Sequence, residues 1–424
     1  MDPTRAERIA ERQALTLMEA LGLVREAVAA GMPADSCLSE FHRNHHEFGS
    51  RDRRLFSSVI FAYFRWKGWL DLLTDRPNVA CVFAHLLEAD ELHPAVRKLA
   101  TRAGMAEPLP DPMGSLTLPE KAEALERYAG HPFSLAQLVP VWVPALLGPD
   151  SDRLIASFQS PPPTWLRTDP ARRAEIVRAL LEHGERPDPH AVVRSAIAVP
   201  RGINLRAIPH PTRDRLDIQD LASQAVGLIC DPKPGQNWWD ACCGSGGKTI
   251  HLAELGGPSL RLLASDIRPS MLQGLTRRLE EARLKFVETA VWDGTTEPPP
   301  GEHFDGILLD APCSGTGTWH RNPDARQRTS REAVESLVGL QCKLLSTCAG
   351  RLKPGGVLVY ATCSVTTVEN EDLIAAFLAA NPGFAPTPFL NPLTGQDCPG
   401  LLRINPWDGP CNGMFIAKIL LKPY

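Results

Sequence analysis

Two cysteines have the residue type and the positions that could do covalent chemistry. Cys313 lies in DAPCSGTG and Cys363 in ATCSVTTVENE, and each follows a run of apolar residues. A thiolate is a strong nucleophile that can form a covalent intermediate. Such a nucleophile can add to an electron-poor carbon of a substrate and make the neighbouring carbon reactive. A buried structural cysteine is the alternative at either position alone, but the pair favours catalysis.

A glycine-rich turn in WWDACCGSGGKTIHLAE could bind a cofactor. Glycines allow close approach to the backbone, and a helix N-terminus offers free N–H groups. A dinucleotide site requires GxGxxG, but no glycine stands three residues after Gly246. A phosphate-binding loop requires GxxxxGK[ST], and Cys242 occupies the position of its first glycine. The third candidate ligand is S-adenosylmethionine (SAM).

Acidic residues at successive strand ends favour SAM among these ligands. Asp266 ends RLLASD, where a carboxylate can accept hydrogen bonds from both ribose hydroxyls. Asp293 follows the next apolar run, near the expected position of the adenine amino group. Asp240 and Asp310 end two further runs. Each acid alone would be an ordinary strand-end residue, but together they predict a SAM site.

The elements that must position these residues alternate between strands and helices. Strands are predicted at 237–241, 261–266, 285–290, 304–310, 356–362 and 414–421, and helices at 247–256, 269–284, 331–352 and 369–380. This alternation predicts a mostly parallel sheet with helices on both faces and ligands at the carboxyl ends of its strands. We therefore expect a Rossmann-like α/β domain over residues 229–424.

The preceding residues predict two further segments. Apolar residues at three- and four-residue spacing, such as Leu17, Leu21, Val24 and Val28, predict a helical domain over 1–150. Residues 155–228 are expected to form a small α+β segment. Within it, the stretch 163–215 contains ten arginines and six acidic residues, an excess that favours contact with a phosphate backbone.

Composition narrows the class of protein. The chain has 424 residues, a net charge of −4 and 11 cysteines, an odd number with no CxxC pair. This pattern predicts reduced cysteines and neither a disulfide framework nor a metal site. No apolar run reaches the length of a membrane span, and the N-terminus is charged from its first residues. We expect a cytoplasmic protein, monomeric and without a membrane segment.

The cysteine motifs resemble those of the RNA cytosine-5 methyltransferases, the RsmB/Sun (Fmu) and NOL/NSUN superfamily. The resemblance runs from PTWLR at 163–167 through IQDLASQAV at 218–226 and DACCGSGGKT to NGMFIAKI at 412–419. The N-terminal DRRLFSSVIFAYFRWKGWLD is similar to the NusB-like helical RNA-binding domain of RsmB-type enzymes. The paired Pro-Cys and Thr-Cys motifs are the most specific part of the resemblance. DNA cytosine methyltransferases use the Pro-Cys residue as nucleophile, so the presence of both motifs favours an RNA substrate.

This resemblance implies a SAM-dependent Rossmann-like methyltransferase with a role for each motif residue. Cys363 would be the covalent nucleophile, and Cys313 would help to release the enzyme from the methylated base. Lys248 and Asp310 would also lie close to the target base. The family's SAM contacts correspond to Cys242, Cys243, Gly244, Ser245, Gly246, Gly247, Lys248, Asp266, Asp293 and Asp310.

The resemblance also implies an RNA partner, with 16S ribosomal RNA as the expected substrate. Transfer RNA is the alternative substrate. A non-catalytic RNA-binding ribosome assembly factor and a nucleotide hydrolase are alternatives of other classes. Four arginines after the Pro-Cys motif could hold flanking phosphates or form a solvent-exposed helix surface: Arg321, Arg326, Arg328 and Arg331.

Overall fold

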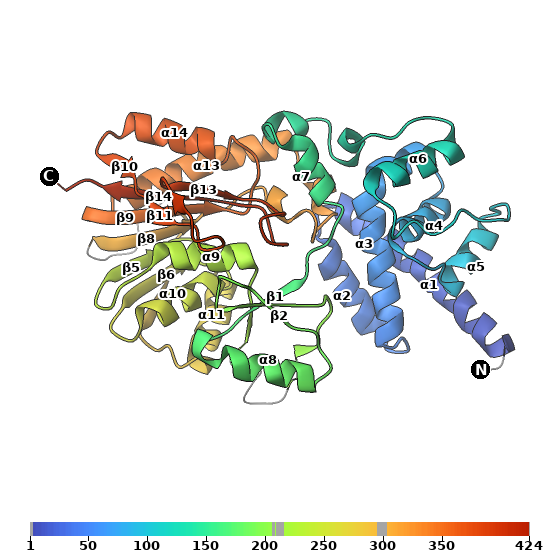
Figure 1. Ribbon diagram of the computed structural model, residues 1–424, viewed down its shortest axis with the longest axis horizontal. Coiled ribbons are helices and arrows are strands. Elements are labelled where there is room, and N and C mark those ends of the chain that lie inside the picture. The colour runs from blue at the N-terminus through green and yellow to red at the C-terminus, as the bar shows by residue number, and fades with distance from the viewer. Residues whose placement is uncertain (1–2, 206–207, 209–215, 295–302, 424) are drawn as a thin grey trace. The chain divides into compact units, whose positions relative to one another are not determined.

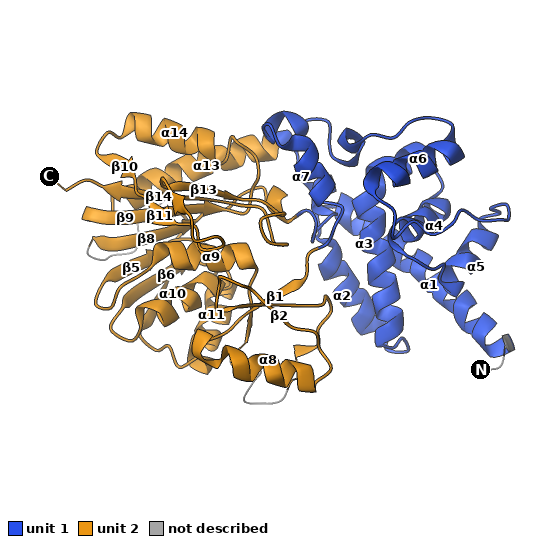
Figure 2. Ribbon diagram, in the orientation of Figure 1, with its two compact units in different colours: residues 1–161, 319–331 blue, residues 162–318, 332–424 orange. Residues whose placement is uncertain are grey.

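The computed structural model describes residues 3–205, 208, 216–294 and 303–423. The chain divides into two compact units (Figure 2). One comprises Met1–Pro161 together with Trp319–Arg331, and the other comprises Pro162–Thr318 together with Glu332–Tyr424. The segments predicted at 155–228 and 229–424 thus fall almost entirely in the second unit, and the sequence gives no sign that 319–331 belongs to the first.

The first unit is helical, as the spacing of its apolar residues predicts. The stripe on the first helix is buried, with Leu17, Leu21 and Val24 each at most 1% exposed. The helices are α1 (Pro3–Ala29), α2 (Ala34–Asn44), α3 (Ser50–Leu73), α4 (Pro77–Glu88), α5 (Pro94–Arg102), α6 (Leu118–Ala129), α7 (Ser151–Ser157) and α12 (Ala325–Arg328).

The segment 319–331 is part of the core of this helical unit. Trp319 is fully buried, and its ring packs edge-on against Phe158 at 5.7 Å between centroids. Arg326 is 1% exposed, and its guanidinium donates hydrogen bonds to the backbone carbonyls of Arg65, Leu138 and Phe158 at 3.0–3.1 Å. The prediction that Arg326 holds an RNA phosphate is therefore wrong, because its donors are used inside the protein.

The second unit contains a twisted sheet with helices on both faces (Figure 1). Its strands are ordered β10-β14-β9-β8-β5-β6-β7, and β13 pairs with β14. Pairing is parallel from β9 through β7 and antiparallel at β14. The strands are β5 (Asn237–Asp240), β6 (Arg261–Asp266), β7 (Val287–Val291), β8 (Phe304–Asp310), β9 (Leu352–Thr362), β10 (Phe384–Pro386), β13 (Leu401–Ile404) and β14 (Met414–Leu421).

Side-chain alternation along β5 explains the two covered faces. Trp238 and Trp239 are consecutive, so they point to opposite sides of the sheet. Trp238 packs with Leu221 and Leu252, whereas Trp239 packs with Leu344. The covering helices are α9 (Leu221–Cys230), α10 (Gly247–Gly256), α11 (Pro269–Glu281), α13 (Arg331–Ala349) and α14 (Glu371–Ala380). The predicted Rossmann-like α/β architecture is confirmed.

A smaller antiparallel sheet precedes this domain. Its strands are ordered β2-β3-β1-β4, with bounds β1 (Thr164–Arg167), β2 (Asp188–Pro189), β3 (Ala196–Val199) and β4 (Asp217–Ile218). Helix α8 (Arg173–Glu182) packs with it through Ile176 and Leu180. A two-stranded sheet joins β11 (Phe389–Leu390) to β12 (Asp397–Cys398). Of the ten arginines of the basic stretch, Arg206, Arg213 and Arg215 lie outside the described residues.

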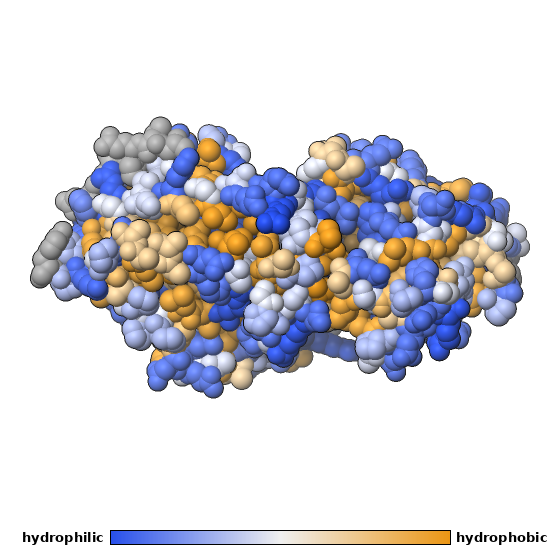
Figure 3. All heavy atoms as spheres, turned by 90° about the horizontal axis from the view of Figure 1, so that it is seen from above, coloured by the Kyte–Doolittle hydropathy of each residue, from blue (hydrophilic) through white to orange (hydrophobic). Residues whose placement is uncertain are grey.

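Hydrophilic and hydrophobic residues are intermixed on the face seen in Figure 3. Within the described ranges, no helix combines the length and apolar character that crossing a membrane requires.

Candidate active site

The two cysteines meet at the carboxyl edge of the sheet. Strands β8 and β9 pair in parallel, with Asp310 opposite Ala361, so the loops that follow them leave from the same edge. These loops bring the Sγ atoms of Cys313 and Cys363 to 3.4 Å from each other. Gly317 N donates a 2.9 Å hydrogen bond to the carbonyl of Cys363 and holds the loops together.

The two thiols differ in their electrostatic environment. The hydrogen bond that Cys313 donates lowers the pKa of Cys363, and the nearby Lys248 ammonium lowers it further against the effect of burial. The same hydrogen bond raises the pKa of Cys313 well above its usual range, and burial adds to the rise. These opposite shifts make Cys363 the more acidic thiol of the pair, and the thiolate is the nucleophilic form of cysteine.

Lys248 and Asp310 form an ion pair beside the thiols. The Lys248 Nζ atom lies 2.7 Å from Asp310 Oδ2, and both side chains are partly buried. Burial alone would lower the pKa of Lys248, but the Asp310 carboxylate outweighs it and raises the pKa above its ordinary value. Lys248 therefore stays cationic, which favours negative charge on Cys363.

The glycine loop joins β5 to α10 with a backbone that glycine permits. Gly244 and Gly246 have φ angles of 53° and 82°, in the left-handed region. A Cβ on Gly246 would lie 2.2 Å from Leu275 Cδ1, whereas one on Gly244 would meet no atom closer than 4.0 Å. The loop therefore packs against α11 at Gly246 and leaves open space at Gly244.

The cysteines of this loop have protonated thiols. Burial raises the pKa of both Cys242 and Cys243. The Cys243 side chain packs with Ile250 and Leu275, and its backbone N–H donates to Ser265 O at 2.8 Å. A contact of these residues with a cofactor would therefore involve the backbone.

Two of the predicted strand-end acids are held in contrasting ways. Asp266 is 5% exposed and accepts hydrogen bonds from Gly244 N and from the Arg268 guanidinium at 2.9–3.1 Å. Burial would raise the pKa of Asp266, but the Arg268 hydrogen bonds lower it overall. Asp240 is fully buried, and burial raises its pKa to about 7. Its Oδ2 accepts from Thr249 at 2.7 Å, whereas no described residue donates to Oδ1.

Asp293, another of the predicted strand-end acids, is half-buried and lies just after β7. The predicted residues thus lie on the carboxyl ends of β5, β6, β7, β8 and β9 and on the loops that follow them. No group of three or more His, Cys, Asp and Glu side chains among the described residues could hold a metal ion.

Sequence reasoning missed two residues of this site, Arg268 and Glu369. Arg268 covers the Asp266 carboxylate, and only its place two residues after that acid suggests the contact. Glu369 is fully buried between the cysteine loops. Glu369 lies within the motif ATCSVTTVENE, which is the only signal for it, because by residue type alone it looks like an acid at a helix N-terminus.

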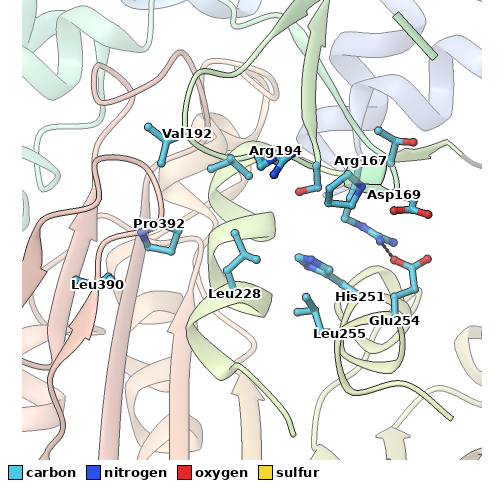
Figure 4. Close-up of a pocket in the computed structure, with 14 residues that line it drawn as sticks. Arg167, Asp169, Val192, Arg194, Leu228, His251, Glu254, Leu255, Leu390 and Pro392 are labelled. Atoms are coloured by element: carbon cyan, nitrogen blue, oxygen red, sulfur yellow. Dashed lines mark hydrogen bonds and ion pairs between the residues drawn. The ribbon is translucent and has the colours of Figure 1, made fainter. Parts of the chain in front are cut away.

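A separate cavity of about 730 Å³ lies on the outer side of α9 and α10 (Figure 4). Arg167 and Glu254 form an ion pair at its wall, and His251 lies beside them. Burial keeps the pKa of His251 well below its ordinary value, so this imidazole is neutral. None of the predicted site residues lines the cavity. The predicted site residues therefore lie apart from this cavity, at the carboxyl edge of the sheet.

Comparisons with known sequences agree with this arrangement. A profile described as 16S rRNA methyltransferase RsmB/F matches residues 227–420. The probable ribosomal RNA small subunit methyltransferase B of Synechocystis sp. is 32% identical over 317 residues, which cover 71% of this chain and 68% of that protein. Ribosomal RNA small subunit methyltransferase B of Yersinia pestis is 34% identical over 267 residues, which cover 62% of this chain and 60% of that protein.

Solved structures share the fold. The crystal structure of PH0851 superposes with a TM-score of 0.73 at 22% identity and covers 94% of this chain and 98% of its own. A methyltransferase homolog protein from Pyrococcus horikoshii gives a TM-score of 0.52 at 26% identity over 65% of this chain and 92% of its own. These structures agree in fold, and the sequence matches show that the chain belongs to the RsmB/F family of 16S rRNA methyltransferases.

Proposed function

We propose that the protein is a SAM-dependent RNA cytosine-5 methyltransferase that acts on 16S ribosomal RNA through a covalent cysteine–cytosine intermediate. The observation that carries the proposal is the contact of two thiols, 3.4 Å apart, beside the Lys248–Asp310 ion pair. A methyltransferase that used no covalent step would have no need of a polarised thiol pair. The names of the similar proteins support ribosomal RNA as the substrate.

The residues at the sheet edge fit SAM. The buried Asp240 Oδ1 has no partner among the described residues, and the ammonium of the methionine end would supply one. The open space at Gly244 would admit the ligand close to the backbone. We assign the ribose hydroxyls to Asp266 and the adenine amino group to Asp293. SAM, when bound, supplies an electrophilic methyl group.

The same geometry speaks against a nucleoside triphosphate. In phosphate-binding loops, the lysine reaches the β- and γ-phosphates. Here the Lys248 ammonium is committed to Asp310 at 2.7 Å. Cys242 also stands where such a loop has its first glycine. We therefore prefer methyl transfer to nucleotide hydrolysis.

In the mechanism that we propose, the Cys363 thiolate adds to carbon 6 of a cytosine turned out of its stack. The C5=C6 π electrons shift away from carbon 6, so that carbon 5 becomes nucleophilic and bonds to the methyl group that SAM would supply, while the S–CH3 bond of the donor breaks and its electron pair stays on the thioether product. Loss of the carbon 5 proton then restores the double bond as the C6–S bond breaks. The departing sulfur is a thiolate, to which Cys313 donates its hydrogen bond, while cationic Lys248 stabilises the same charge.

We further propose that the helical unit is NusB-like and binds RNA together with the basic stretch of the second unit. Arg178, Arg186 and Arg194 of that stretch are exposed and could track a phosphate backbone. We also propose that the protein acts as a monomer.

Bisulfite sequencing of unmodified 16S rRNA after incubation with protein and SAM tests this function. We expect one protected cytosine with the parental protein and none with Cys363→Ala. Binding of SAM without any protected cytosine would instead support the non-catalytic assembly factor, and protection confined to transfer RNA would support the other substrate.

A further inference from the structure

A buried carboxylate lies between the two cysteine loops. Glu369 is fully buried, and its Oε2 atom accepts hydrogen bonds from the hydroxyls of Ser314 at 2.6 Å, Ser364 at 2.5 Å and Thr366 at 2.8 Å. Its Oε1 atom accepts from Ser314 N at 2.8 Å and from Gln341 Nε2 at 3.0 Å. No described Lys, Arg or His forms an ion pair with it, so five hydrogen bonds alone satisfy the carboxylate.

The partners of Glu369 connect it to both thiols. Ser314 directly follows Cys313, and Ser364 directly follows Cys363. The Glu369 carboxylate is therefore hydrogen-bonded to the serine that follows each cysteine. Further bonds hold Glu369 itself, since the Tyr360 hydroxyl on β9 donates to its backbone carbonyl at 2.8 Å. The whole network ties the two loops to the end of the strand that precedes Cys363.

An ionised carboxylate in the interior is costly unless its hydrogen bonds are complete. Apolar side chains could fill the same space without that cost, so filling space does not explain an acid here. The carboxylate instead accepts hydrogen bonds from both cysteine loops at once, and these directional bonds fix the distance between the loops. In catalysis, an error of about 1 Å in the position of a reacting group can cost roughly 10²-fold in rate.

We propose that Glu369 is a positioning residue that holds Cys313 and Cys363 in contact for the two halves of the reaction. It touches neither base nor cofactor, because it is fully buried behind the cysteine loops. This role rests on the proposed function, in which one thiol attacks the base and the other assists its release. The contact itself exists in the free protein and can be tested there.

Single-turnover methylation tests the role in the reaction. We expect Glu369→Ala to lower the rate about 10²-fold, as displacement of a reacting group would. Glu369→Gln keeps an oxygen acceptor of the same reach, so it should recover part of that loss. SAM affinity should be unchanged in both, and exposed Asp372, on the same segment, provides Asp372→Asn as the matched control. A Glu369→Ala protein that methylates at the parental rate would overturn the proposal.

Alkylation of Cys363 by iodoacetamide, followed by peptide mass spectrometry without RNA, tests the thiol contact directly. Loss of the Cys313 hydrogen bond should shift the alkylation profile of Glu369→Ala to higher pH, as in Cys313→Ala, because that bond has the largest influence on the pKa of Cys363. Glu369→Gln and Asp372→Asn should keep the parental profile. A parental profile in Glu369→Ala would overturn the proposal whether or not any variant methylates RNA.

The two experiments separate two kinds of failure. If the profile shifts but the parental protein methylates no RNA, Glu369 holds the thiols and the proposed function is wrong. If the parental protein methylates RNA and Glu369→Ala changes neither rate nor profile, the function stands and the positioning role is wrong.

Discussion

Asp240 is a buried carboxyl group with one oxygen to which no described residue donates a hydrogen bond, and burial raises its pKa to about 7. If that oxygen receives the ammonium of SAM, only the ionised form binds well. The carboxyl group takes up a proton below its pKa, so affinity for SAM must fall as the pH falls through 7. With one competing proton, the loss between pH 7.5 and pH 6 is roughly tenfold.

Calorimetric titration of SAM at several pH values checks this. Asp240→Asn removes the titrating group, so its affinity should be weaker and nearly independent of pH over the same range. Equal affinity of the parental protein at pH 6 and pH 7.5 would show that Asp240 does not receive the ammonium.

Individual site residues were predictable from the sequence to different degrees. Cys313, Cys363 and the strand-end acids stand at the ends of apolar runs, and a parallel sheet brings such positions to one edge. Glu369 and Arg326 could not be found in this way. Their partners lie far away in the chain, such as Ser314, or are backbone carbonyls, which leave no trace in the sequence.

The loop between β5 and α10 depends on glycine at one position above all. At Gly246 an added Cβ would meet Leu275, and the φ of 82° is unfavourable for any other residue. We expect Gly246→Ala to lower the free energy of unfolding by about 2–4 kcal/mol, from strain and overpacking together. It should also weaken SAM binding, because the loop must shift away from α11.

Gly274 is the matched control for this change. It lies within α11 with an ordinary backbone and no atom within 4 Å of an added Cβ. Gly274→Ala should be neutral or stabilise the protein by up to about 1 kcal/mol. Denaturant unfolding of both variants tests the pair, and equal stabilities would contradict the assigned geometry of the loop.

The predicted strands and helices of the second unit match the observed ones to within a few residues. Strands β5, β6, β8 and β9 are mostly apolar runs that end at a polar residue, as strands with both faces covered are expected to be. Boundaries were less predictable. Strand β9 begins at Leu352 rather than at residue 356, because Leu352 pairs with Phe304 of β8 before an irregularity in the register, and regular pairing resumes at Val357.

The division of the molecule into units was the least predictable feature. A segment that directly continues the Pro-Cys loop, Trp319–Arg331, belongs to the core of the helical unit. Trp319 is buried in that core, and Arg326 donates hydrogen bonds to the backbone carbonyls of Arg65, Leu138 and Phe158. Composition cannot reveal that this segment belongs to the helical unit, because arginine is usually a surface residue and here it is buried.

Arg326→Met should therefore destabilise the helical unit, because it leaves buried carbonyls of Arg65, Leu138 and Phe158 without these donors. We expect a loss of about 3 kcal/mol in the free energy of unfolding. Arg51 is exposed in the same unit, and Arg51→Met should change stability by no more than about 0.5 kcal/mol. Unfolding followed by tryptophan fluorescence compares the two, and an equal effect would show that Arg326 is not an internal anchor.

The whole protein, with its RNA, is needed to establish that Cys363 is the nucleophile and Cys313 the residue that assists release. Capture of the covalent complex is the most direct measurement. Cys313→Ala protein is incubated with unmodified 16S rRNA and SAM, and denaturing electrophoresis with peptide mapping locates any cross-link. We predict a stable adduct on the peptide that contains Cys363, and none in the Cys313→Ala, Cys363→Ala double variant. An adduct that persists without Cys363 would contradict the assignment.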